Sequence, residues 1–211
     1  MPVRPPWSIV GRTGKAPSPV ARLSSNVRRH MQPFLDSSRL LLRPYTLADA
    51  PEVQRLASDR RVAEPTAAIP HPYPAGAAQA WIATHADNFS SRRGVSYAVI
   101  LKSTTQLVGT VSLMDVSSVH ARAEVGYWVG FDFWGRGLCA EALACLLDFG
   151  YSYFAITRFI GRCVGSNPAS ARVLEKCGFN REGVQVKHVF RSGRFDDMVL
   201  YGRCHSSRHV A

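Results

Sequence analysis

The chain has 211 residues, of which 46% are hydrophobic and 19% charged, so it is long enough to bury a core and is not disordered throughout. Its net charge is +11, but six of its basic residues lie in residues 1–30, which contain no Asp or Glu. The rest is mildly basic, which suits a small anionic ligand, and no apolar run reaches about 18 residues, which argues against a transmembrane helix.

The first part of the chain differs in composition from the remainder. Residues 1–30 are predicted to be a basic disordered tail, or an extension ahead of a true start at Met31. The lack of acidic residues also resembles a transit peptide, although Pro5, Pro6, Pro17 and Pro19 argue against one continuous amphipathic helix. Residues 31–211 are predicted to form a single domain.

The domain is predicted to begin with a strand and two helices. Residues 39–45 form the expected strand, and a capping box from Thr46 then opens a helix with Leu47 on its apolar stripe. Residues 60–75 contain four prolines and are predicted to be a loop. Residues 76–88 form the second expected helix.

The hydrophobic period then changes to that of strands. Three strands are expected at residues 96–101, 107–113 and 122–129, and their short links make them antiparallel. A helix over residues 137–153 and a strand over residues 158–164 complete a βαβ unit, so the strands flanking this helix should be parallel neighbours.

The chain is predicted to end with a short helix and two strands. Asn167 starts the helix, and the strands cover residues 183–190 and 194–201. The element order β-α-α-β-β-β-α-β-α-β-β predicts a mixed α/β sheet and not a doubly wound parallel one.

A glycine-rich segment lies between the third strand and the long helix. Residues 134–140 read Trp-Gly-Arg-Gly-Leu-Cys-Ala. Glycines at a helix N-terminus let backbone N–H groups approach an anion, and the helix dipole favours negative charge, so a pyrophosphate would fit. An ordinary turn is the alternative, because the segment is neither a Walker A loop nor Gly-x-Gly-x-x-Gly, whose third glycine is replaced by Ala140.

Four stretches together resemble a known family. They are residues 39–45 (Arg-Leu-Leu-Leu-Arg-Pro-Tyr), 123–129 (Ala-Glu-Val-Gly-Tyr-Trp-Val), 133–142 (Phe-Trp-Gly-Arg-Gly-Leu-Cys-Ala-Glu-Ala) and 167–179 (Asn-Pro-Ala-Ser-Ala-Arg-Val-Leu-Glu-Lys-Cys-Gly-Phe). In this order the chain resembles, over residues 36–203, the GNAT superfamily of N-acetyltransferases and its RimJ/RimL-like (ribosomal-protein-alanine N-acetyltransferase) branch. The resemblance implies a GNAT fold, in which helices flank a central mixed sheet with splayed parallel strands.

The resemblance also implies acetyl-CoA as co-substrate and a set of residues that bind it. Backbone groups at Trp128 and Val129 would pair with the pantetheine arm, which Asn167 would also contact. Trp134 stands where other branches have Gln or Arg, and a cysteine replaces the last Gly or Ala of the family's loop pattern. The amides expected to hold the CoA pyrophosphate are those of Gly135, Arg136, Gly137, Leu138, Cys139 and Ala140.

Two residues are candidates for the chemistry. Glu124 is the candidate base, because an ammonium must lose a proton before its nitrogen attacks a thioester. The alternative is a structural Glu paired with Arg122 or Arg162. By resemblance, Ser170 would stabilise or protonate the leaving thiolate; the alternative is an ordinary first-turn residue in a helix that Asn167 caps.

The expected function is transfer of acetyl from acetyl-CoA to a primary amine by direct attack, with a protein N-terminal α-amine as the leading acceptor. A small amine of polyamine or aminoglycoside type, or a non-catalytic CoA-binding module, is the alternative. His71, Tyr73 and His188 are expected to lie near the acceptor groove as packing residues.

Partners and location follow from the same features. A homodimer is left open, ribosome or nucleic-acid contact rests on the basic tail alone, and a cytoplasmic protein without membrane contact is expected. No metal site is expected, because the five cysteines include no Cys-x-x-Cys pair and no zinc-finger spacing.

Overall fold

The computed structural model describes residues 31–66, 68–191 and 193–205. The tail predicted for residues 1–30 lies outside these residues. The helices and strands all belong to one unit, which begins at Gln32.

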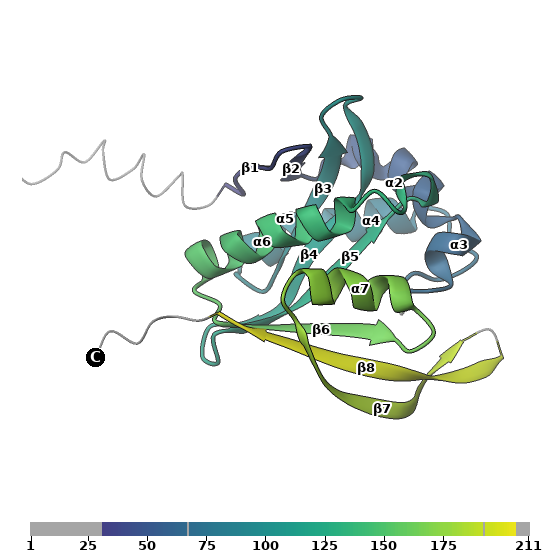
Figure 1. The fold of residues 1–211 in the computed structure, drawn as a ribbon. Coiled ribbons are helices and arrows are strands. Elements are labelled where there is room, and N and C mark those ends of the chain that lie inside the picture. The colour runs from purple at the N-terminus through teal and green to yellow at the C-terminus, as the bar shows by residue number, and fades with distance from the viewer. Residues whose placement is uncertain (1–30, 67, 192, 206–211) are drawn as a thin grey trace, which may run out of the picture. The chain divides into compact units, whose positions relative to one another are not determined.

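The described strands form one mixed sheet (Figure 1). They are β1 (Leu35–Asp36), β2 (Leu40–Pro44), β3 (Val95–Leu101), β4 (Gln106–Ser117), β5 (Arg122–Val129), β6 (Arg158–Val164), β7 (Asn180–Arg191) and β8 (Arg194–Cys204). Their order in the sheet is β1-β2-β3-β4-β5-β6-β8-β7. All neighbours are antiparallel except β5 and β6, which are parallel, so the predicted mixed sheet is confirmed.

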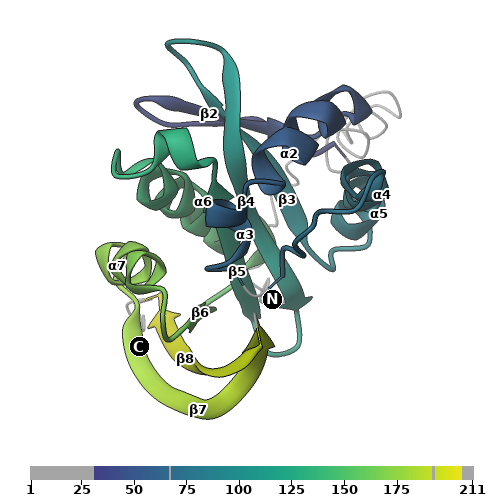
Figure 2. The same cartoon turned by 90° about the vertical axis from the view of Figure 1, so that its right-hand side faces the viewer.

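Helices cover both faces of this sheet. They are η1 (Leu47–Asp49), α2 (Ala50–Ala57), α3 (Arg60–Ala63), α4 (Ala77–Ala83), α5 (His85–Ser90), η2 (Phe131–Phe133), α6 (Leu138–Phe154) and α7 (Pro168–Lys176). Figure 2 shows α2 and α4 on one side of the sheet and α6 and α7 on the other.

Successive side chains of a strand point to opposite faces of the sheet, so each face has a hydrophobic core of its own. In β3, Tyr97 packs into the core beneath α6, whereas Ala98 packs with α2 and α4. In β5, Val125 belongs to the α6 side and Trp128 packs against the core on the α2 side. Neighbouring β5 residues therefore face opposite sides of the molecule.

The parallel pair β5–β6 is short, and the two strands then separate. Their pairing runs from Arg122 opposite Arg158 to Val125 opposite Gly161. Beyond that point β5 continues beside β4 alone, and β6 continues beside β8 alone. The expected splay of the parallel strands is thus present.

The structure corrects three details of the local predictions. The segment predicted to be a loop over residues 60–75 contains α3, and the helix expected over residues 76–88 is divided into α4 and α5 at Thr84. Thr84 Oγ1 donates a hydrogen bond to the Trp81 carbonyl oxygen, a local bond that competes with helix continuation. Leu47 is 62% exposed, because it lies in the 3-10 turn ahead of α2.

Glu141 in the first turn of α6 ties this helix to the chain entering β2. Its carboxylate accepts hydrogen bonds from the hydroxyls of Ser37 and Ser38 at 2.8 and 3.0 Å, and from Arg39 N and Nε at 2.8 and 2.7 Å. Burial alone would raise the pKa of Glu141, but these hydrogen bonds lower it to about 2. The ionised form is therefore the one that the fold stabilises.

Replacing Glu141 is expected to destabilise the protein in a pH-dependent way. Glu141→Gln should lower the free energy of unfolding by about 2 kcal/mol at pH 7, since hydrogen bonds to a charged group are lost. The pKa of Glu141 in the folded state lies below the ordinary 4.5. Its contribution to the free energy of unfolding is therefore fully present above pH 4.5 and is lost as the pH falls towards 2. Urea unfolding of parent and variant at pH 7 and pH 3 measures the difference.

The exposed pair Glu52–Arg55 on α2 provides the control for this experiment. Glu52→Gln should cost less than about 0.5 kcal/mol, because solvent screens such a pair. Equal effects of the two substitutions, or a Glu141 effect unchanged at pH 3, would contradict the assignment.

Candidate active site

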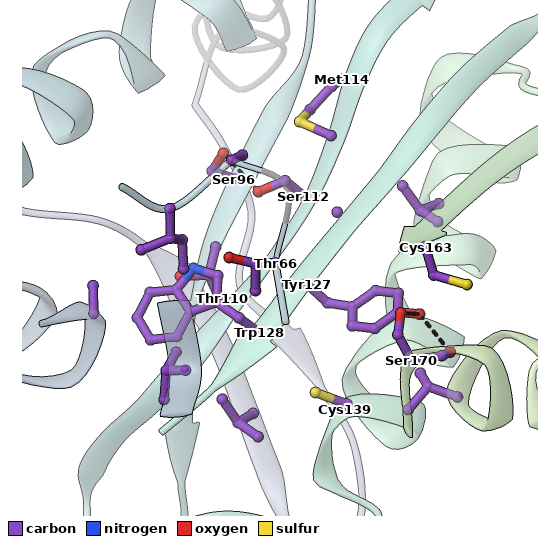
Figure 3. A pocket seen from close by; sticks show the side chains of 18 of the residues that line it. Thr66, Ser96, Thr110, Ser112, Met114, Tyr127, Trp128, Cys139, Cys163 and Ser170 are labelled. Atoms are coloured by element: carbon purple, nitrogen blue, oxygen red, sulfur yellow. Dashed lines mark hydrogen bonds between the residues drawn. The ribbon is translucent and has the colours of Figure 1, made fainter. Parts of the chain in front are cut away.

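A cavity of about 1210 Å³ lies where β5 and β6 separate, and residues from both faces of the sheet line it. Figure 3 shows part of its lining. Of the predicted site residues, those that line the cavity are Glu124, Trp128, Val129, Gly135, Gly137, Leu138, Cys139, Ala140, Asn167 and Ser170. Arg136 does not line it; its guanidinium lies 5.6 Å from the centre of the Phe133 ring.

The glycine-rich loop has the geometry of an anion site. Gly135 and Gly137 lie at φ +73° and +74°, a conformation that glycine adopts without strain. The N–H of Glu141 bonds the Gly137 carbonyl oxygen at 3.1 Å, which leaves the N–H groups of residues 138–140 without acceptors inside the helix. These groups lie at the positive end of the 17-residue helix α6. Burial raises the pKa of the Cys139 thiol to about 12, so the thiol adds no negative charge there.

Arg39, which directly precedes β2, contacts this loop, although sequence patterns provided no reason to assign it a role. Its Nη1 donates to the Arg136 carbonyl oxygen at 3.0 Å, while Nε binds Glu141. Its Nη2 lies beside Gly137, where an added Cβ would be 3.7 Å away. The guanidinium, which is paired with the Glu141 carboxylate, therefore stands next to the free N–H groups. The contact joins residues 97 positions apart, so no local pattern could have revealed it.

On the α7 side of the cavity, two hydroxyl groups lie together. Ser170 Oγ is 2.9 Å from Tyr127 Oη, which also donates to the Ser170 carbonyl oxygen at 3.0 Å. Figure 3 shows Tyr127 pointing towards Ser170 and Trp128 pointing away from it. Burial raises the pKa of Tyr127, so its phenol keeps its proton at neutral pH. Tyr127 stands inside the motif that identified Glu124, but the sequence alone did not give it a role.

Asn167 joins two parts of the cavity wall. Its Oδ1 accepts from the Ser170 N–H at 3.0 Å, so Asn167 is the N-cap of α7. Its Nδ2 donates to the Pro65 carbonyl oxygen at 2.8 Å, in the proline-rich segment after α3. Arg191 Nη2 donates to the carbonyl oxygens of Ala63, the last residue of α3, at 2.8 Å and of Ile69, in the same proline-rich segment, at 3.4 Å.

Glu124 lines the cavity from β5 and lies beside Arg162. Its Oε2 is 3.2 Å from Arg162 Nε, so the arginine partner is Arg162 and not Arg122. Burial is the largest influence on the pKa of Glu124 and raises it; Arg162 opposes this shift and Asp115 adds to it. Glu124 is therefore a carboxylate that accepts a proton more readily than an exposed one.

The half of the cavity on the α2 and α4 side is lined by hydroxyl groups and one histidine. Ser112 Oγ donates to Ser96 Oγ at 2.9 Å, and the hydroxyl of Thr110 is 2.6 Å from that of Tyr45, which does not itself line the cavity. His85 of α5 lines the same half and is only 6% exposed. The sequence did not single out these residues.

The residues suggested for the acceptor side fall into two groups. Tyr73 lines the cavity, whereas His71 and His188 do not. The carboxylates among the described lining residues are Asp115 and Glu124. The cations that line the cavity are Arg93, Arg162, Arg172 and Lys176.

Two negative findings concern residues 31–66, 68–191 and 193–205. No group of three or more His, Cys, Asp and Glu residues is placed to hold a metal ion there. No helix in that part of the chain has both the length and the apolar character needed to span a membrane.

Residues 39–180 match the family described as acetyltransferase (GNAT) domain. The chain belongs to this family. It is 28% identical over 171 residues to Bacillus subtilis "Uncharacterized N-acetyltransferase YoaA", an alignment that covers 81% of this chain and 96% of that protein. It is also 29% identical over 112 residues to the Escherichia coli ribosomal-protein-serine acetyltransferase, which covers 53% of this chain and 63% of that protein.

Solved structures show the same fold at low identity. RimL, a ribosomal L7/L12 alpha-N-protein acetyltransferase in complex with coenzyme A, superimposes with a TM-score of 0.74 at 19% identity and covers 82% of this chain and 98% of its own. Spermidine N-acetyltransferase from Vibrio cholerae, in complex with CoA and spermine, gives 0.71 at 20% identity, with 81% and 98% covered. The GNAT resemblance is confirmed, and the chain is a GNAT N-acetyltransferase; acetyltransferases of ribosomal proteins are among the relatives and solved structures that it resembles.

Substitutions of Asn167 should separate its two contacts. Asn167→Ala should cost about 1–2 kcal/mol of stability, because α7 loses its cap. Asn167→Asp keeps the cap and loses the donor to Pro65, so it should stay closer to the parent in urea unfolding. Hydrogen exchange of the Thr66 backbone N–H should nevertheless be faster in Asn167→Asp than in the parent. Equal stability of the two variants would contradict the capping role, and unchanged exchange at Thr66 would contradict the contact with Pro65.

Proposed function

We propose that this enzyme transfers acetyl from acetyl-CoA to a protein N-terminal α-amine by direct attack. The observation that carries the proposal is the gap between β5 and β6, because it connects the two faces of the sheet. Glu124 lies on the α2 side of this gap, on the same face of β5 as Trp128. The Ser170–Tyr127 pair lies on the α7 side. An acceptor and a thioester would therefore meet from opposite sides.

The α6 side fits the CoA portion of the co-substrate. The N–H groups from Gly135 to Ala140, with Arg39 beside them, would hold the pyrophosphate. Trp128 and Val129 would pair with the pantetheine arm along the open edge of β5. The Val129 carbonyl oxygen accepts a bond from the Trp134 indole at 2.9 Å, and a carbonyl has a second lone pair for a further donor.

Asn167 retains capacity for the same ligand. One N–H and one lone pair of its amide are engaged by Pro65 and Ser170, which leaves one of each for pantetheine. Arg136 would contribute its backbone N–H, because its side chain lies against Phe133 and does not line the cavity.

The proton that the acceptor loses would pass to Glu124, directly or through water. Acetyl-CoA, when bound, supplies an activated thioester carbonyl. The amine nitrogen forms a bond to the carbonyl carbon as the carbon–sulfur bond breaks. The proton that the nitrogen still carries passes to the Ser170 hydroxyl as this hydroxyl gives its own proton to the departing sulfur, so Ser170 ends neutral, and Tyr127 supports Ser170 through its own hydroxyl. Arg162 holds Glu124 in position without removing its capacity to accept a proton.

The charge of the cavity favours an acceptor with one positive charge over a polyamine. The carboxylates among its described lining residues are Asp115 and Glu124, and Glu124 is already paired with Arg162. A polyamine carries several positive charges, and this lining offers one carboxylate outside an ion pair to receive them. The relatives include proteins named for each kind of acceptor: the Escherichia coli protein is named for a ribosomal-protein serine, and the Vibrio cholerae enzyme is named for spermidine.

The test is the pH dependence of peptide acetylation by Glu124→Gln. At pH 6 the α-amine is protonated, and loss of the base should lower kcat/KM about 100-fold. Above about pH 8 the amine is largely neutral, so the loss should shrink. Steady-state assays with a short peptide from pH 6 to pH 9 measure this.

Acetyl-CoA affinity of Glu124→Gln, which should equal that of the parent, is the control. A loss of activity that stays constant across the pH range would assign Glu124 a structural role. Acetylation of spermidine in preference to every peptide would overturn the proposed acceptor.

A further inference from the structure

On the α2 and α4 side, the cavity is charged at one end of β5 and apolar at the other. Side chains alternate along a strand, so Glu124, Gly126 and Trp128 share one face of β5. Opposite them in register on β4 are Met114, Ser112 and Thr110, and all six residues line the cavity. Glu124 and Trp128 lie about 13 Å apart along the strand. Between this carboxylate and this indole ring, Gly126 presents no side chain.

One wall of this half of the cavity carries no charge. It consists of the lining residues between positions 53 and 84, and those that the structure describes include no Asp, Glu, Lys, Arg or His. Their polar side chains are the hydroxyls of Thr66, Tyr73 and Thr84, and the others are Val, Ala, Ile, Pro and Trp. Tyr73 and Trp81 pack against the same buried cluster as Trp128, so this uncharged wall adjoins the apolar end of β5.

The uncharged wall is held in place by contacts with the rest of the fold. Three of its carbonyl oxygens accept hydrogen bonds from side chains of other elements: Pro65 from Asn167 at 2.8 Å, Ile69 from Arg191 at 3.4 Å and Tyr73 from Gln54 at 3.3 Å. The Trp81 ring meets the rings of Tyr45 and His85 edge-on, with ring centres 5.3 and 4.3 Å apart. The shape of the wall is therefore set before an acceptor binds, as in most small-molecule sites.

We propose that the uncharged wall receives a large apolar side chain on the first residue of the acceptor, such as that of leucine, methionine or phenylalanine. The α-amine and the first side chain are attached to one Cα, so a carboxylate and an apolar wall on the same face of the sheet suit both groups at once. A small side chain would bury little apolar surface there, and a charged one would lose its hydration without gaining a partner. This inference rests on the proposed function, because it takes the amine to react beside Glu124.

Peptides that differ only in their first residue provide the test. With acetyl-CoA saturating, the parent should acetylate peptides that begin with Leu, Met or Phe with a kcat/KM at least about tenfold above that for Ala, Ser or Lys. The three additional carbon atoms that leucine buries relative to alanine account for a factor of this size. Leucinamide and alaninamide, assayed in parallel, measure the same preference without a peptide.

Two alanines of α4 provide a variant and its matched control. Ala77 is half-buried and lines the cavity, whereas Ala80 is exposed and lies outside it. Ala77→Phe should fill the space beside the wall and lower kcat/KM for the Leu peptide at least about tenfold, mainly through KM, while changing that for the Ala peptide less than about threefold. Ala80→Phe should behave like the parent with both peptides.

A second substitution at the same position separates loss of the apolar site from misfolding. Ala77→Asp places a carboxylate at the first position of α4, where a helix accepts negative charge, so the variant should fold and bind acetyl-CoA like the parent. It should lose the preference for Leu and gain activity on the Lys peptide. Ala80→Asp should do neither.

Each contrary result has its own meaning. A parent that acetylates peptides equally well whatever their first residue, or that prefers Ala or Ser, would overturn the apolar site and leave the protein acceptor standing. A parent that prefers leucinamide over alaninamide but acetylates no peptide would overturn the protein acceptor and leave the apolar site standing. Equal effects of the Ala77 and Ala80 substitutions would contradict the placement of the first side chain at this wall.

Discussion

The site depends on one constraint, the early end of the pairing between β5 and β6. The last paired position is Gly161, where a Cβ would come within 2.6 Å of the Leu174 side chain. Glycine there lets α7 pack directly on β6, which brings Ser170 to the open edge of β5 and to Tyr127. A longer parallel ladder would fill the gap between the strands, and the cavity would no longer connect the two faces of the sheet.

The two sides of the gap differ in chemistry because neighbouring residues of a strand face opposite ways. Tyr127 faces α7, where hydroxyl groups and the free N–H groups of α6 favour negative charge. Glu124 faces the other side, where a carboxylate with a raised pKa accepts protons. A single strand thus separates the part of the cavity suited to an anionic leaving group from the part suited to an amine.

Local sequence patterns predicted most of the secondary-structure elements. Periodicity located the strands and α6, and the glycines and the Asn-Pro step located the helix starts. Of the residues predicted for the catalytic and acetyl-CoA sites, all but Arg136 line the cavity. The contacts of Arg39 and the pairing of Tyr127 with Ser170 were not predictable, because they join residues 97 and 43 positions apart. His85 was missed as a lining residue because the sequence pattern of a helix does not show which histidine lies at a cavity.

The central claim is that the glycine-rich loop at this gap binds acetyl-CoA, and calorimetry with a loop variant tests it most directly. The parent should bind acetyl-CoA in the micromolar range, about −8 kcal/mol. Gly137→Glu, which places a carboxylate at the loop, should abolish binding. Gly193→Glu introduces the same charge at a glycine with a similar φ of +76° in the β7–β8 turn, and should bind like the parent. A folded parent that does not bind, or equal binding by both variants, would contradict the account.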